Sequence, residues 1–282
     1  MKLESTLVLC DLDALMLGPD GNLTQVLRDV LQLFTARGGR MTVFSQKTPK
    51  AVRTILGSVP LSAPALLCGG ALVYSFAAGS GQPMGSFAAL GDDFLAKLPA
   101  APGIGIALQM KDGATRVVRM NHALERHLRR EWTPYLLTQP EGVSCQDVLR
   151  VLLYQDAKTI PALQTFEKAL EESGAPVRQE RLAIDCLALT PGAVSMGAAF
   201  SSVCAAAMLS PENVAVLAGS APMVELMRLA GQSAAAFDAP AEVRLAAGQV
   251  TFCRAAEGAA AEYLYQLVRS SGRQGCANHV NG

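Results

Sequence analysis

Two aspartates, Asp11 and Asp13, stand one residue apart at the end of an apolar run, LVLCDLDALML at residues 7–17. Paired carboxylates are rare inside a strand, because burying an unpaired charge is costly and burying two close together costs more. We therefore expect the pair to lie at the carboxyl end of the strand. There the two carboxylates either meet a cation and a substrate, or they open a solvated turn that does no chemistry.

The segments around the aspartates predict alternating strands and helices. Apolar strands are expected at 6–11 and 40–45, and apolar residues at helical spacing predict helices at 23–39 and 48–57. Thr48 is the expected cap of the second helix, with Pro49 in its first turn. The same alternation returns late in the chain, between about residues 212 and 272. Strand and helix in alternation imply a parallel sheet with right-handed crossovers, which is an α/β fold.

Polar residues gather where these strands end. In open parallel sheets, ligands bind beyond the carboxyl ends of the strands. Asp11 and Asp13, Ser45, and the segment GSAP at 219–222 all follow predicted strands. These separate stretches are therefore expected to form one cleft.

The middle of the chain differs from its two ends in composition and in the order of its predicted elements. Residues 81–185 contain joints rich in Pro and Gly, the candidate strands GIGIALQM, TRVVRM and VLRVLLYQ, and one helix-like segment. This pattern predicts a cap domain at 81–185, inserted into a core domain made of residues 1–80 and 186–282.

The composition excludes several classes of partner. Lys plus Arg equals Asp plus Glu at 24 each, so no overall field favours nucleic acid or an anionic membrane. One basic helix-like stretch, LERHLRREW at 124–132, is either an interaction surface or a solvated face. Neither a signal peptide nor a membrane span is predicted. Seven scattered cysteines without a Cys-x-x-Cys pair indicate a reduced, cytoplasmic protein.

The chain resembles the haloacid dehalogenase (HAD) superfamily, in particular its Cof-like branch with a IIB cap, over about residues 5–270. DLDALM resembles the motif Asp-x-Asp-Gly-Thr, and LALTPGAVSMGAAFSSV resembles ITP-x-GVSKG-x-AL. NVAVLAGSAPMVELMRLAG resembles NVIAFGD-x-xND-x-x-ML-x-x-AG. The resemblance implies a Rossmannoid core, with a parallel sheet and helices on both faces, and an inserted α/β cap.

The resemblance also implies roles for individual residues. Asp11 would be the nucleophile that forms an aspartyl-phosphate, and a ligand of Mg²⁺. Asp13 would be the general acid and base, and its backbone carbonyl would bind the same metal. Ser45 and Lys47 would bind the phosphate. From the residues alone, Ser45 equally suits a turn or helix cap, and Lys47 a surface charge.

Several positions depart from the family pattern. Met196 stands where the family has the lysine that holds nucleophile and phosphate together. Ser220 replaces the metal-binding aspartate, and Met223 and Val224 replace the supporting Asn-Asp pair. Glu225 follows one residue later, but a helix rotates it by about 100° from the required face. These substitutions weaken the Mg²⁺ site that the resemblance implies.

The residues and the resemblance together predict a HAD-superfamily phosphohydrolase homologue that is impaired or inactive and retained for binding a ligand or a partner. The alternative is an active Mg²⁺-dependent phosphatase of small phosphorylated metabolites, such as sugar or nucleotide phosphates. In that case a cap cation such as Arg116, Arg119 or Lys158 would replace the missing lysine.

Overall fold

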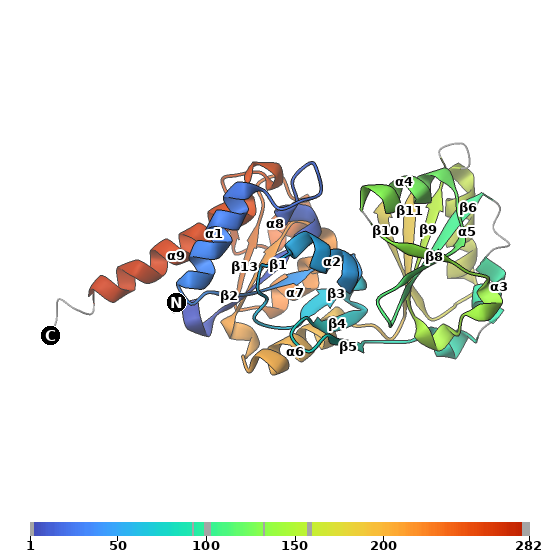
Figure 1. Ribbon diagram of the computed structural model, residues 1–282, viewed down its shortest axis with the longest axis horizontal. Coiled ribbons are helices and arrows are strands. Elements are labelled where there is room, and N and C mark those ends of the chain that lie inside the picture. The colour runs from blue at the N-terminus through green and yellow to red at the C-terminus, as the bar shows by residue number, and fades with distance from the viewer. Residues whose placement is uncertain (1–2, 92, 99–102, 132, 157–159, 278–282) are drawn as a thin grey trace.

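The structure of the protein is a computed structural model that describes residues 3–91, 93–98, 103–131, 133–156 and 160–277. The chain forms two lobes, each built on its own sheet (Figure 1). The expected combination of an α/β core with an inserted cap is confirmed, and the first lobe carries both ends of the described chain.

The core lobe is built on an eight-stranded sheet in the order β14-β13-β12-β1-β2-β3-β4-β5. The six strands from β14 to β3 are parallel, and β4 and β5 are antiparallel additions at one edge. Every residue of β1 is buried, as is typical of a central parallel strand covered on both faces. The strands are β1 Leu7–Asp11, β2 Arg40–Phe44, β3 Ala65–Leu67, β4 Leu72–Ser75, β5 Ser80–Pro83, β12 Val214–Ala218, β13 Gln232–Ala235 and β14 Gln249–Val250.

Helices cover both faces of this sheet. The crossovers from β1 to β2 and from β12 to β13 run in opposite directions, so right-handed connections place α1 and α7 on opposite faces. The last helix, α9, packs against α1, whereas α6 and α8 pack against α7. The helices are α1 Gln25–Ala36, α2 Pro49–Leu56, α6 Met196–Ala207, α7 Val224–Leu229, α8 Ala241–Ala246 and α9 Ala259–Ala277.

The start of α2 agrees with the sequence in position but not in bonding. Thr48 is the residue before the helix and Pro49 its first residue, as expected. The Thr48 side chain makes no capping hydrogen bond, however. The fixed backbone of the proline, which lacks an N–H to satisfy, therefore does more to define this helix start than the threonine hydroxyl does.

The cap lobe is built on a six-stranded sheet in the order β10-β11-β9-β6-β7-β8. All pairs are antiparallel except β7 with β8. Its strands are β6 Ile104–Met110, β7 Thr115–Arg119, β8 Tyr135–Leu137, β9 Val148–Gln155, β10 Val177–Ala183 and β11 Cys186–Pro191, and its helices are α3 Asp93–Lys97, α4 His122–Arg130 and α5 Ile160–Glu172. Separate clusters of buried side chains lie on its two faces.

The strands β5 and β11 lie where the chain passes from one sheet to the other. The strand β5, at 80–83, belongs to the core sheet, and β11, at 186–191, belongs to the cap sheet. Each strand pairs with a neighbour in the sheet that the chain is leaving, β5 with β4 and β11 with β9. In the part of the chain that the structure describes, no helix has the length and apolar character needed to cross a bilayer.

Candidate functional site

Three strand ends bring the predicted site residues together. The central strand β1 ends at Asp11 and lies between β2, which is followed by Ser45, and β12, which is followed by Gly219 and Ser220. A turn of π-helix at Leu12–Met16 then carries Asp13 across the end of the sheet. At this end of the sheet, Asp11 contacts Gly219 and Ser220, and Asp13 contacts Ser45.

Asp11 is buried, and both of its carboxylate oxygens accept hydrogen bonds. One oxygen accepts from the backbone N–H of Ala14 at 3.1 Å, and the other accepts from the N–H of Gly219 at 3.3 Å and from the hydroxyl of Ser220. Burial raises the pKa of Asp11 to about 6; the Ser220 hydrogen bond lowers it, and the nearby charge of Asp13 raises it. The carboxylate is thus held by neutral donors alone.

Asp11 has no cationic partner in the part of the chain that the structure describes. Among the described residues, no Lys, Arg or His nitrogen forms an ion pair with its carboxylate. Of the cap cations expected as substitutes, Arg116 pairs with Asp112 at 3.8 Å, and no ion pair joins Arg119 to Asp11. Lys158 lies outside the described residues.

Met196 is the first residue of α6 and is buried. Its sulfur lies so close to Gly70 that a Cβ added to the glycine would overlap it. Gly70 also has a φ of +88°, which disfavours any larger residue. Met196 and Gly70 therefore pack closely against each other.

Asp13 occupies a cradle of donors that begins at the end of β2. The Ser45 hydroxyl lies 3.1 and 3.0 Å from the two Asp13 oxygens, and the Gln46 N–H donates to one of them at 2.6 Å. The Lys47 ammonium lies 3.4 Å from an Asp13 oxygen. Ser45 and Lys47 thus hold the carboxylate of Asp13, and the three donors together make a site suited to an anion.

The residues at the positions of the metal motif that the resemblance implies make other contacts in this structure. Ser220 donates to Asp11, Met223 is fully buried, and Val224 begins α7. Glu225 accepts a hydrogen bond from the backbone N–H of Gly197 at 2.9 Å, so it caps the start of α6. Glu225 therefore does not replace the missing aspartate, in agreement with the rotation predicted from helix geometry.

Side chains of the cap contact the core loop at Gln46. Arg150 of β9 is fully buried and donates to the side chain of Gln46 and, at 2.7 Å, to Glu180. Gln109 of β6 donates to the Gln46 carbonyl at 3.0 Å. A Cβ at Gly69 would meet the Arg150 guanidinium, so glycine at this position makes room for it.

Sequence reasoning missed these cap contacts. Their one signal was Arg150, the single charge inside the otherwise apolar strand VLRVLLY. A charged side chain in a buried strand requires a partner, and the partners of Arg150 prove to be the Glu180 carboxylate in the cap and the Gln46 side chain in the core loop. Glu131, just after α4, pairs with Lys47 and carries no comparable signal, because it is one of several charges on a polar stretch.

A cavity of about 700 Å³ lies between the lobes. Asp13 and Lys47 line it from the core, and Arg126, His127 and Tyr154 line it from the cap. Burial lowers the pKa of His127 to about 4, with smaller effects from the charges of Lys47 and Arg130. This volume suits a small organic ligand.

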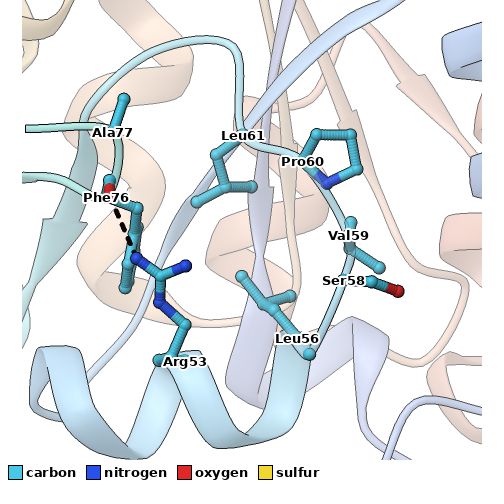
Figure 2. A pocket seen from close by; sticks show the side chains of 9 residues that line it. Arg53, Leu56, Ser58, Val59, Pro60, Leu61, Phe76 and Ala77 are labelled. Atoms are coloured by element: carbon cyan, nitrogen blue, oxygen red, sulfur yellow. Dashed lines mark hydrogen bonds between the residues drawn. The ribbon is translucent and has the colours of Figure 1, made fainter.

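A second cavity, of about 280 Å³, lies beside the C-terminal end of α2 (Figure 2). Arg53 lies over the ring of Phe76, 4.8 Å from its centroid, and donates to the Phe76 carbonyl at 3.0 Å, with Leu61 nearby. Helices that follow parallel strands end at the opposite edge of the sheet, so this cavity lies away from Asp11. It contains none of the predicted site residues.

Comparison with known proteins identifies the fold. No protein-family model matches the sequence, and no curated protein is significantly similar to it. Among solved structures, it is similar to a haloacid dehalogenase-like hydrolase from Bacteroides thetaiotaomicron, with a TM-score of 0.81 and 14% identity over 93% of this chain and 99% of the other.

Two further structures are phosphatases by their descriptions. A HAD-superfamily phosphatase from the same organism matches with a TM-score of 0.72 and 15% identity over 93% of this chain and 94% of the other. A HAD subclass IIB sugar phosphatase matches with a TM-score of 0.73 and 14% identity over 93% and 98%. The chain therefore has the fold of HAD-like hydrolases, with the cap domain included.

Proposed function

We propose that this chain is a HAD-fold phosphohydrolase homologue that no longer hydrolyses phosphate esters efficiently and instead binds a small anionic ligand between its lobes. The observation that carries the proposal is the environment of the Asp11 carboxylate. Its buried carboxylate is held by Ala14, Gly219 and Ser220, and no described cation balances it.

Attack on phosphorus would require an Asp11 oxygen that is free and whose charge is offset. Two like charges repel strongly at close range in a medium of low dielectric constant, so an uncompensated carboxylate opposes the approach of a phosphate dianion. Loss of a single electrostatic group from such a site typically lowers turnover by about 10² to 10³. Met196 and Ser220 each replace such a group.

The residues present are a poor fit for Mg²⁺. This ion prefers one or two carboxylates together with water and phosphate oxygens in octahedral geometry. Both Asp11 oxygens are already hydrogen-bonded, and one of the donors, Ser220, stands at the position of the missing carboxylate. No group of three or more Asp, Glu, His or Cys side chains within the described ranges is arranged to hold a metal. We therefore assign no step to a metal.

Binding, unlike hydrolysis, has the groups that it needs. The Ser45 hydroxyl, the Gln46 N–H and the Lys47 ammonium converge on the Asp13 carboxylate, and Asp13, Gln46 and Lys47 line the cavity of about 700 Å³. The descriptions of the similar phosphatases support a phosphorylated metabolite as the ligand. We propose a cytoplasmic location, because Cys10, Cys68, Cys186 and Cys204 are buried free thiols.

Hydrolysis of p-nitrophenyl phosphate and of a panel of sugar and nucleotide phosphates tests the proposal. The natural protein is compared with Asp11→Asn, with and without Mg²⁺, and Asp20→Asn in an exposed turn is the matched control. Equal background rates in all three proteins are expected. Mg²⁺-dependent turnover that Asp11→Asn abolishes and Asp20→Asn retains would overturn the proposal in favour of an active phosphatase.

A further inference from the structure

The basic helix α4 has two faces with different environments. Leu124 and Leu128 are buried in the cap core, so they anchor the helix on the cap sheet. Arg126 and Arg130, one helical turn apart, both line the cavity between the lobes. Arg129 does not line this cavity and pairs with Glu125 at 2.7 Å; its side chain is 79% exposed and that of Arg130 is 77% exposed. The basic stretch 124–132 therefore contributes two of its arginines to the cleft.

These two arginines are weakly compensated. In the described part of the chain, no acidic side chain forms an ion pair with Arg126, and Arg130 has one contact, at 3.4 Å, with its neighbour Glu131. Asp185 also lines the cavity. His127 lies between the cationic groups, and its depressed pKa keeps it neutral near pH 7. Guanidinium groups bind phosphates and carboxylates through paired N–H donors, so this wall of the cleft suits an acidic group.

The third cation of the cleft lies on the core side. Lys47 contacts Asp13 at 3.4 Å and also pairs with Glu131, the residue that follows α4. The acidic group of a ligand that reaches Lys47 would take the place of the Glu131 carboxylate. The cavity is thus lined by one cation on the core and by two on the cap.

We propose that the ligand of this cleft carries two separate acidic groups, one bound at Lys47 and the other at Arg126 and Arg130. This inference rests on the proposed function, in which the cleft binds a small anion. It goes further by naming the charge pattern of the ligand and the cap residues that recognise it. A ligand with one acidic group satisfies only one of the two cationic points.

Isothermal titration calorimetry with fructose 6-phosphate and fructose 1,6-bisphosphate tests this proposal. EDTA in the buffer removes divalent cations, so that hydrolysis does not complicate the titration. The bisphosphate is expected to bind about tenfold more tightly than the monophosphate, which corresponds to about 1.4 kcal/mol. The double variant R126Q/R130Q is expected to lose this preference and to keep its affinity for the monophosphate within about twofold.

The matched control is Arg129→Gln, which removes one charge from the same helix at a position that does not line this cavity. It is expected to keep the tenfold preference. Equal affinities for the two sugars, no binding of either, an unchanged preference in R126Q/R130Q, or an equal loss in Arg129→Gln would each overturn the inference. Mg²⁺-dependent turnover that requires Asp11 would instead overturn the proposed function and leave the measured preference as it stands.

Discussion

The buried carboxylate of Asp11 predicts an unusual dependence of stability on pH. Its pKa rises from an ordinary value of 3.8 to about 6 in the folded protein, chiefly because burial disfavours the charge. Between these two values the folded state binds more protons than the unfolded state. The contribution of Asp11 to the free energy of unfolding therefore increases as the pH falls from 8 towards 4, which is the reverse of a carboxylate in a salt bridge.

The size of the effect follows from the two pKa values. A difference between 3.8 and about 6 corresponds to a limit of about 3 kcal/mol at low pH. At pH 5 the folded protein has gained about 1.4 kcal/mol of this, and at pH 8 almost none. Asp11→Asn removes the titration. An amide nitrogen then faces one of the backbone donors, Ala14 or Gly219, at a cost that does not vary with pH.

Urea unfolding of the natural protein and of Asp11→Asn at several values between pH 8 and pH 5, in EDTA, measures this contribution. Other groups titrate in both proteins and cancel in the difference. They include His127, whose lowered pKa makes the fold less stable as the pH falls below about 6.5. The natural protein is expected to gain about 1.4 kcal/mol relative to the variant. A difference that stays constant, or that changes in the opposite direction, would refute the description of Asp11 as a buried, uncompensated carboxylate.

Three further predictions concern the site and the cap. The double variant Met196→Lys with Ser220→Asp is expected to hydrolyse p-nitrophenyl phosphate, in the presence of Mg²⁺, about 10²-fold above the Asp11→Asn background. It introduces the lysine and the metal-binding aspartate of the family pattern. A folded double variant without turnover would contradict this prediction. Glu131→Gln removes one of the two carboxylates that contact Lys47 and leaves Asp13. Inorganic phosphate is then expected to bind about fivefold more tightly by calorimetry, as for loss of a competing ion pair worth about 1 kcal/mol. Unchanged affinity would count against competition at Lys47. Arg150→Met leaves Glu180 without its buried partner and is expected to lower the free energy of unfolding, measured in urea, by about 3 kcal/mol. The control Arg181→Met, in a more exposed pair with Glu167, is expected to lower it by less than about 1 kcal/mol. Equal losses in the two variants would refute the distinction.

The strands and helices that carry the site could be read from local patterns. Each apolar run that the sequence predicts as a strand near Asp11, Ser45 and Gly219 is a strand of the core sheet, and the helical spacing of 124–132 corresponds to α4. Such patterns are reliable because burial on one or both faces acts on neighbouring residues. The ends of the two domains were less predictable, since β5 and β11 are assigned by which sheet they pair with.

The sequence by itself indicated which residues lie at the strand ends, with the neutral residues Met196 and Ser220 among the candidate positions. Only the tertiary structure decided how the remaining charges are balanced. Ser220 reaches Asp11 across 209 positions of sequence, Arg150 reaches Gln46 across 104, and Glu131 reaches Lys47 across 84. Hydrogen bonds and ion pairs depend on distances of a few ångströms. The pairing of β1 with β12 sets the distance from Ser220 to Asp11, and the relative placement of the two lobes sets the other two. Periodicity within one segment carries no information about that placement.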